Sequence, residues 1–257
     1  MNVLVTGASS GIGEALAVVS ARRGADKLFL CGRDAARLAA VAEKCRAFGA
    51  EVFDRVVDVT DEAAVKAWLD ACDAQGPLEL VLSNAGVATG RETSENVKRT
   101  FAVNVGGNLN VVLGAVDLFR ARPEGRRVRQ IAITASIAGY APLATCPAYA
   151  GTKAAMKNWG LSLRGMLKRE GIRVNVVCPG FVRSRITDRN LCPMPFFMEA
   201  EQAAEIILAR LKKNVGLVAF PWPMRLAVWL LSAIPWRLAE FASGLLPEKN
   251  RDNRCPF

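Results

Sequence analysis

The sequence predicts an α/β fold, in which a doubly wound sheet of about seven mainly parallel strands carries helices on both faces. Three observations lead to this class. Short apolar runs alternate with segments of helical composition along the chain. Most of these runs are rich in Val, Ile and Leu and largely uninterrupted, which is typical of strands buried on both faces of a parallel sheet. A glycine-rich turn follows the first run, where a strand would give way to a helix.

The predicted elements alternate regularly, which favours right-handed crossovers between neighbouring strands. The strand-like runs lie near residues 2–6, 27–31, 51–57, 78–82, 128–134, 172–178 and 215–220. The helical segments lie at about 11–23, 34–47, 61–75, 94–122, 147–169 and 199–213. Three helices begin beside residue types that favour the N-cap position, namely Asp34, Thr60 or Asp61, and Thr93 or Ser94.

The length of 257 residues suits one domain that spans 1–257. We expect a core at about 1–220 and an apolar helical extension at about 221–247. The first strand-like run leaves no room before it for a signal peptide, and the seven cysteines form no CxxC pair. These features favour reduced thiols and a cytoplasmic location.

Composition excludes several kinds of catalysis. The chain has no histidine, which excludes Ser-His-Asp and Cys-His catalysis and makes a zinc site improbable, so we expect no metal. The formal net charge of +10 suits an anionic cofactor. Basic residues are not interleaved with aromatic ones, so we do not expect nucleic-acid binding.

A tyrosine and a lysine, Tyr149 and Lys153, lie four residues apart in a helical segment and therefore share one face of it. A free tyrosine has a pKa of about 10 and is a poor acid or base at neutral pH. A neighbouring ammonium favours the phenolate, so we expect Lys153 to lower the pKa of Tyr149. The pair could then donate and accept a proton in carbonyl and alcohol chemistry.

The glycine-rich turn has the sequence context of a dinucleotide site, because it follows a strand-like run and opens a helix. Gly7 permits the tight turn, Gly11 lets backbone amides approach a pyrophosphate, and Gly13 allows close packing of the helix on the sheet. The helix N-terminus then meets the phosphate charge. The residues expected to contact the cofactor here are Gly7, Ser9, Ser10, Gly11, Ile12 and Gly13.

Together with further motifs, the turn resembles that of the short-chain dehydrogenase/reductase family over roughly residues 2–190. Ser83-Asn84-Ala85-Gly86 is similar to the family's NNAG motif, with serine in place of the first asparagine. Ser136 precedes Tyr149 by 13 positions, the usual separation in the family. Asn104 stands where the family carries a catalytic asparagine, and Pro179-Gly180 closes the sixth strand-like run. The resemblance implies a Rossmann sheet and an NAD(P)-dependent oxidoreductase.

The resemblance also implies a role for each matching residue. Tyr149 would exchange the proton with the substrate oxygen, and Ser136 would hydrogen-bond that oxygen. Lys153 would hold the nicotinamide ribose, and Asn104 would position a water that links Lys153 to solvent. The further positions expected to bind cofactor are Asp58 and Val59 at the adenine, Asn84, Ala85 and Gly86 after the fourth strand, and Pro179, Gly180, Val182 and Ser184 after the sixth.

The second strand-like run ends in Arg33, not in the carboxylate that would bind the ribose of NAD(H). An arginine can pair with a 2′-phosphate through two hydrogen bonds, so we favour NADP(H) over NAD(H). Asp34 follows, but we interpret it as the cap of the next helix. Ser10 stands where many NADP-preferring relatives carry a second basic residue.

The substrate pocket is expected to be apolar, which favours a hydrophobic ketone, aldehyde or lipid-like alcohol. Simple packing of the same side chains as a lid is the other interpretation. The residues expected there are Ile137, Ala138, Tyr140, Pro142 and Leu143 after the serine, and the segment 185–198 with Met194, Phe196, Phe197 and Met198. Family analogy also suggests a homodimer or homotetramer, which would use the helices at 94–122 and 147–169.

The apolar extension is the least typical segment, because Pro235 should split it into two short helices. One interpretation is a cover for the substrate cleft or an oligomer interface. Another is that 221–246 lies in a membrane interface, with Trp and Arg at headgroup level. The function alternatives are therefore a soluble reductase, a membrane-peripheral reductase of a lipid intermediate, and a nucleotide-sensing relative without catalysis. A sensor would not need the tyrosine-lysine pair.

Overall fold

The computed structural model describes residues 1–257 except 123–124, 126, 190–192, 234, 236 and 239–257. In the described part, seven strands form one sheet in the order β3-β2-β1-β4-β5-β6-β7, and every pairing is parallel. The strands are β1 (Asn2–Thr6), β2 (Lys27–Gly32), β3 (Glu51–Val56), β4 (Leu80–Ser83), β5 (Gln130–Thr134), β6 (Arg173–Pro179) and β7 (Leu217–Phe220). The predicted class is confirmed, and the described sheet is wholly rather than mainly parallel.

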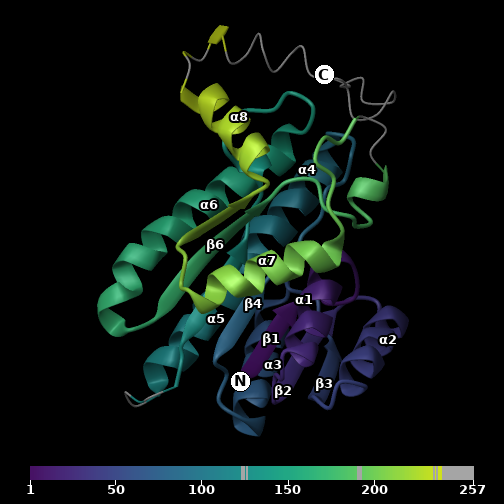
Figure 1. Cartoon of the computed structure of the whole chain (residues 1–257), viewed down its shortest axis with the longest axis vertical. Helices are drawn as coiled ribbons and strands as arrows, with labels where there is room; N and C mark the ends of the chain where they lie inside the picture. The colour runs from purple at the N-terminus through teal and green to yellow at the C-terminus, as the bar shows by residue number, and fades with distance from the viewer. Residues whose placement is uncertain (123–124, 126, 190–192, 234, 236, 239–257) are drawn as a thin grey trace.

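Helices cover both faces of the sheet (Figure 1). They are α1 (Gly11–Arg22), α2 (Ala35–Arg46), α3 (Glu62–Gln75), α4 (Ser94–Phe101), α5 (Asn108–Ala121), α6 (Pro147–Leu167), α7 (Ala200–Lys212) and α8 (Trp222–Ala233). Helices α1, α2 and α7 share one core layer with Val3 and Val5, whereas α3, α5 and α6 share the other with Leu4 and Phe29. Successive residues of β1 therefore serve opposite layers, as strand geometry requires.

The predicted helix starts are confirmed at three caps. The side chains of Asp34, Asp61 and Thr93 accept hydrogen bonds from backbone N–H groups three residues further on. Each bond satisfies one of the N–H groups that the first turn of a helix leaves without a partner. The strand β3 departs from the expected pattern, because only Val52 in it is buried. It is the edge of the sheet, so one side has no neighbouring strand and the polar residues Asp54 and Arg55 are accommodated there.

The segment predicted as one helix at 94–122 is continuous but not regular. A π-helical turn, Ala102–Gly107, separates α4 from α5 and carries Asn104. Turns of this kind are frequent at functional sites. By length and composition the run 94–121 could cross a membrane, yet α5 buries Val112, Ala115 and Phe119 in the core. The apolar character of this helix is thus explained by the core.

The C-terminal extension begins with α8, which lies at one end of the molecule beyond the sheet (Figure 1). Pro235 is outside this helix, as predicted, and Arg237 and Leu238 are again helical. The remainder of the predicted second helix, 239–247, lies outside the described residues.

Candidate functional site

The carboxyl ends of the parallel strands open into a cleft of about 630 Å³. This is where ligands bind in open α/β sheets, outside the point at which the strand order reverses between β1 and β4. The predicted residues that line it are Gly7, Ser9, Ser10, Gly11, Ile12, Arg33, Asp58, Val59, Asn84, Ala85, Gly86, Ser136, Tyr149, Lys153, Pro179, Gly180, Val182 and Ser184. The structure thus brings together every predicted site residue except Gly13 and Asn104, which lie behind the surface of the cleft.

The glycine-rich turn has no room for side chains. Gly7 has φ +66°, and a Cβ atom there would lie 2.9 Å from the Cα of Ala85. A Cβ on Gly13 would lie only 2.2 Å from the carbonyl oxygen of Gly7. At Gly11, with φ +58°, a Cβ would lie 2.9 Å from the Cβ of Ser184. The backbone therefore reaches the surface of the cleft at the N-terminus of α1, where the helix dipole favours an anion.

The turn is fixed to the segment after β4 by Thr6. Its hydroxyl accepts hydrogen bonds from the backbone N–H groups of Asn84, at 3.0 Å, and Ala85, at 3.1 Å. The Asn84 side chain donates in return to the Thr6 carbonyl at 3.3 Å. Two motifs of the predicted cofactor site that are more than 70 residues apart in the sequence are therefore joined by hydrogen bonds. The bridging role of Thr6 could not be predicted from the sequence, because it depends on the pairing of β1 with β4.

Ser136 and Tyr149 meet through the packing of two short elements. Ser136 caps the 3₁₀ turn Ile137–Gly139, where its hydroxyl accepts from the Ala138 N–H at 3.1 Å and donates to the Pro179 carbonyl at 3.4 Å. This turn packs directly on α6, because a Cβ on Gly139 would lie 2.6 Å from the carbonyl carbon of Lys153. This close packing places Ser136 beside Tyr149, and both side chains line the cleft.

Lys153 is buried, and its ammonium donates a hydrogen bond to the Thr134 carbonyl at 2.8 Å. The nitrogen lies 5.7 Å from the centre of the Tyr149 ring. Burial lowers the pKa of Lys153 to about 8, so the side chain is mainly an ammonium at neutral pH.

The expected fall in the pKa of Tyr149 is not found in this structure. Burial raises the pKa of Tyr149 to about 12, and a hydrogen bond with Ser136 opposes this shift only partly. Burial removes water from around the phenol and so disfavours the phenolate. Tyr149 is thus a protonated phenol throughout the neutral range, which suits it to donate a proton and not to exist as a phenolate.

Asn104 is fully buried in the π-helical turn, and its side chain makes its hydrogen bonds within the protein. Its amide oxygen accepts from the Val87 N–H at 2.7 Å, and its amide nitrogen donates to the Val87 carbonyl at 2.9 Å and to the Thr152 hydroxyl at 3.2 Å. A Cβ on Gly86 would lie 3.2 Å from the Asn104 amide oxygen and 3.4 Å from the Lys153 nitrogen. Asn104 therefore lies behind Gly86 near Lys153, and its role in a water relay stays a prediction.

The far end of the cleft is lined by arginines. Arg33 is half-exposed and lies 3.9 Å from the Asp58 carboxylate. Burial alone would raise the pKa of Asp58, but hydrogen bonds from Thr60 and the charges of Arg33 and Arg99 together lower it. Arg37 lines the same end and pairs with Asp34 at 2.7 Å. A guanidinium-rich end of this kind can hold a phosphate.

Sequence reasoning missed Arg37 and Arg99, which line the cleft, and Asn108, which supports it. The cap at Asp34 was a usable signal for Arg37, because it places that residue in the first turn of α2 beside Arg33. Asn108 donates to the carbonyls of Ala85, at 3.1 Å, and Asn104, at 2.9 Å. No signal in the sequence distinguishes it from a surface amide on α5.

Most of the apolar residues expected beside the substrate do not line this cleft, and their place in a substrate pocket stays a prediction. Phe196 is 57% exposed, and Phe197 packs under the Arg183 guanidinium 5.2 Å from its ring centre, so neither lines the cleft. Met198 packs against the core instead. From the segment 185–198, the cleft is lined by Arg185, Ile186 and Thr187. None of Ile137, Ala138, Tyr140, Pro142 and Leu143 lines it, because the 3₁₀ turn faces α6 and α8.

Comparison with known proteins places these features in context. A short chain dehydrogenase family model matches residues 1–191. An uncharacterized oxidoreductase of Myxococcus xanthus is 36% identical over 248 residues, which is 95% of this chain and 96% of the relative. A granaticin polyketide synthase putative ketoacyl reductase 1 of Streptomyces violaceoruber is 34% identical, over 72% of this chain and 69% of that one. A solved short-chain dehydrogenase of Sphingobium yanoikuyae in complex with NADPH has a TM-score of 0.77 and 26% identity, and the match covers 98% of this chain and 99% of that one.

Proposed function

The chain belongs to the short-chain dehydrogenase family, and from that premise we propose that it reduces an apolar ketone or aldehyde to an alcohol with NADPH. It is an NAD(P)-dependent oxidoreductase of this family. The observation that carries the proposal is the convergence of Tyr149, Ser136 and Lys153 on one cleft whose other walls are the glycine-rich turn and Arg33.

The residues of the cleft fit a dinucleotide. Its volume of about 630 Å³ falls in the usual range for cofactor sites. The spaces that Cβ atoms would fill at Gly7 and Gly11 leave backbone open to a pyrophosphate at the N-terminus of α1. When bound, the nicotinamide supplies the hydride that reaches the carbonyl carbon of the substrate.

The protein's own part is to hold and move a proton. Tyr149 is protonated in the neutral range and donates its phenolic proton to the carbonyl oxygen as the hydride adds to the carbon. The Ser136 hydroxyl turns from the Pro179 carbonyl, 3.4 Å away, to donate a hydrogen bond to the same oxygen, on which negative charge develops. Lys153, fixed by the Thr134 carbonyl, places a positive charge where the tyrosinate forms. That charge lowers the cost of the proton transfer.

Two features support the finer parts of the proposal. Arg33 and Arg37 at the far end of the cleft favour a 2′-phosphate over a free ribose hydroxyl, and the Sphingobium relative carries NADPH. Aliphatic side chains favour an apolar substrate; among those that line the cleft are Val87, Ala88, Val103, Val182 and Ile186.

An assembly of two or four copies is also part of this proposal. Phe101 on α4 is 45% exposed and its ring lies 3.9 Å from the Cβ position of Gly151 on α6, so an exposed aromatic ring lies where the two helices meet. We expect light scattering to give a mass of two or four chains, and a monomer would contradict the assembly without affecting the reaction.

The test of the reaction uses the two tyrosines of the chain. Tyr149→Phe should lose nearly all turnover with NADPH on a panel of apolar carbonyls while cofactor fluorescence still reports binding. Tyr140→Phe is the matched control. Among the described residues the Tyr140 hydroxyl is buried without a hydrogen-bond partner, so its loss should leave turnover near that of the parent protein. Near-normal turnover by Tyr149→Phe would refute the assignment.

The cofactor preference has its own test. Arg33→Ala should weaken binding of NADPH much more than that of NADH, because only NADPH carries the 2′-phosphate. Lys98→Ala, on the same side of the molecule but not part of the cleft lining, controls for loss of one positive charge. Equal weakening of both cofactors by Arg33→Ala would contradict the preference and leave the reaction itself in place.

A further inference from the structure

Within the described part of the chain, helix α8 contacts the rest of the protein through one of its sides. Met224 and Val228 pack against the cluster formed by Ala135, Ile137, Val176 and Cys178. Apolar side chains also cover the opposite side, with exposed fractions of 73% for Trp222, 46% for Leu226, 54% for Trp229 and 51% for Leu230. These positions are spaced by i, i+4, i+7 and i+8, so they form one continuous stripe along the helix. We call this stripe the α8 face.

A helix that is apolar all round is normally buried on all sides. Two tryptophans and two leucines side by side are more than the scattered single apolar residues of an ordinary surface. Helix α8, with 12 residues, is too short to span a bilayer, which needs about 20. Its outer side is therefore suited to lie along an apolar surface and not to pass through one.

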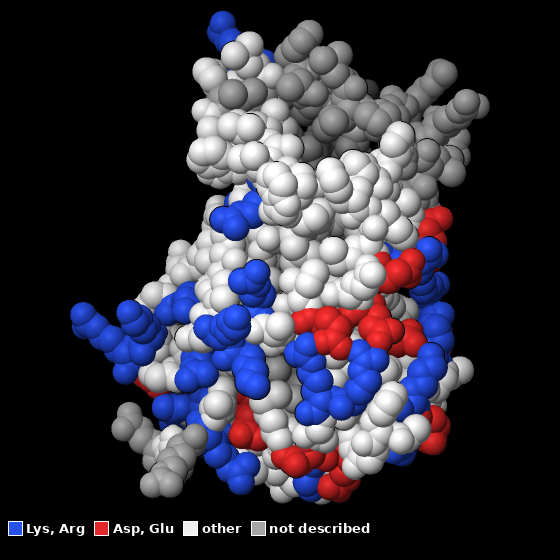
Figure 2. Space-filling view, viewed as in Figure 1, with Lys and Arg blue, Asp and Glu red and all other residues white. Residues whose placement is uncertain are grey.

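The charges beside the α8 face indicate which kind of partner surface it fits. From Pro221 to Leu238 the sequence has two arginines, Arg225 and Arg237, and no acidic residue. Figure 2 shows few charged side chains among the described atoms at the end of the molecule that carries α8, with Lys and Arg side chains at its left border and acidic and basic side chains together at its right border. An apolar stripe bordered by positive charge complements a layer of anionic headgroups over hydrocarbon.

A second copy of the chain complements the α8 face less well. Two such faces brought together would place Arg225 near its own copy, with no acidic residue of the segment to pair with either. A helix of this length offers a strip of roughly 18 by 10 Å, well below the roughly 800 Å² per partner of a stable protein interface. Tryptophan suits a bilayer boundary, because its ring is apolar and its N–H can remain with the headgroups.

We propose that the α8 face docks on the surface of a membrane that contains anionic lipids. The inner side of α8, opposite the docked face, adjoins the catalytic end of the cleft, because a Cβ on Gly180 would lie 3.1 Å from the sulfur of Met224. The protein is thereby held peripherally, with the cleft beside the bilayer. The inference rests on α8 alone and holds whatever the substrate proves to be.

The experiment is flotation of the full chain with vesicles of phosphatidylcholine alone and of phosphatidylcholine with phosphatidylglycerol. We expect binding to the second kind, weakened by salt. Trp229→Ser with Leu230→Ser should reduce the partition coefficient roughly tenfold or more, and Arg225→Gln should reduce it about fivefold on the anionic vesicles only. Met166→Ser is the matched control, since it removes an equally exposed apolar side chain, 59% exposed, from α6.

A second measurement does not depend on any variant. Vesicles with brominated acyl chains should quench part of the tryptophan emission of the unaltered protein, and this quenching should be lost in Trp222→Phe with Trp229→Phe. Failure of the unaltered protein to float, or quenching that survives in that variant, would overturn the proposal. So would a change from dimer to monomer in the Trp229→Ser, Leu230→Ser protein without vesicle binding by the parent, because a second copy would then cover the face.

Discussion

At the scale of single residues, burial and not the spacing of side chains sets the chemistry of Tyr149 and Lys153. Their separation of four residues predicted a shared helix face, and α6 confirms it. Burial favours the neutral form of both side chains. It raises the pKa of the tyrosine to about 12 and lowers that of the lysine to about 8. The sequence could not indicate this, because the loss of water at these two side chains depends on the turn after β5 and on β6 packing over α6.

The lowered pKa of Lys153 predicts a pH dependence. The ammonium form, which stabilises the developing tyrosinate, is half lost at a pH of about 8, while Tyr149 keeps its proton to about 12. Reduction should therefore slow as pH rises through 8 and should show no second limb from the tyrosine below pH 10. The measurement is kcat/KM for NADPH against pH, since this ratio reports ionisations of the protein before the cofactor binds. A rate that stays constant to pH 10 would contradict the assignment of Lys153.

At the scale of elements, irregular helical turns position Asn104 and Ser136, and the sequence did not predict these turns. The run 94–122 predicted one helix, and the π-helical turn within it places Asn104 behind Gly86. Gly107 allows this, because a Cβ there would lie 2.4 Å from a methyl group of Val59. Apolar periodicity reports which side of a helix is buried, but it does not report one extra residue in a turn.

Helix α6 offers a matched pair of glycines that tests its packing. A Cβ on Gly160 would lie 2.7 Å from a methyl group of Val176, whereas Gly165 is exposed and has open space around it. Gly160→Ala should therefore lower the free energy of unfolding by roughly 1–3 kcal/mol, the usual cost of overpacking. Gly165→Ala should raise it by roughly 0.5–1 kcal/mol, because alanine loses less backbone entropy in a helix. Urea denaturation measures both, and a stabilising Gly160→Ala would show that α6 is not seated on β6 as described.

At the scale of the whole molecule, the sequence predicted the layers well and the surfaces poorly. All seven predicted runs are strands, and five of them are mostly buried, as is typical of a parallel sheet that is covered on both faces. The exposed edge at β3 and the outward α8 face were harder to predict. Both depend on which elements are absent from one side, and this is a property of the assembled fold. The place of Arg37 in the cleft likewise depends on how α2 follows β2 in the assembled fold.

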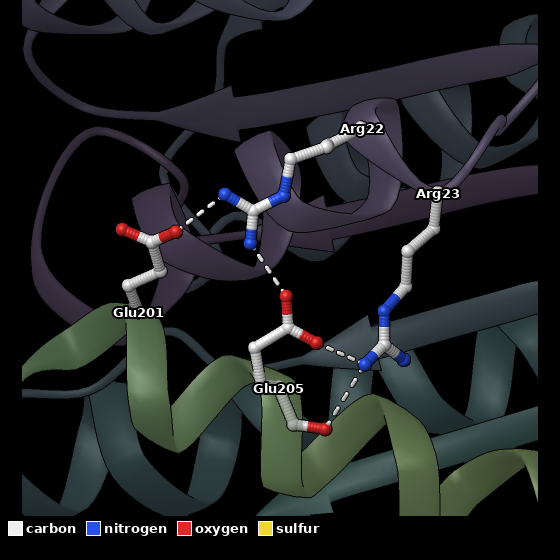
Figure 3. A network of polar contacts seen from close by, with 4 residues as sticks. All are labelled: Arg22, Arg23, Glu201 and Glu205. Carbon is white, nitrogen blue, oxygen red and sulfur yellow. Dashed lines mark hydrogen bonds and ion pairs between the residues drawn. The ribbon is translucent and has the colours of Figure 1, made fainter.

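Closure of the fold brings its first and last core helices together, and a network of ion pairs marks the contact (Figure 3). Glu205 on α7 binds both Arg22 and Arg23, the residues at the end of α1, whereas Glu201 binds Arg22 alone at 2.5 Å. Hydrogen bonds from Arg22 lower the pKa of Glu205 below its ordinary value. The stabilisation from this carboxylate is therefore fully present above the unfolded pKa and is lost as pH falls through the lowered one.

These contacts predict an order of effects. Glu205→Gln should lower the melting temperature more than Glu201→Gln, because it removes charge from two arginine contacts instead of one. The difference between the two variants should shrink in high salt, since the four side chains are exposed and their interaction is screened. It should also disappear at a pH below the lowered pKa of Glu205, where the parent carboxylate is itself protonated. Equal melting temperatures at neutral pH and low salt would mean that α1 and α7 are held by their apolar contacts alone.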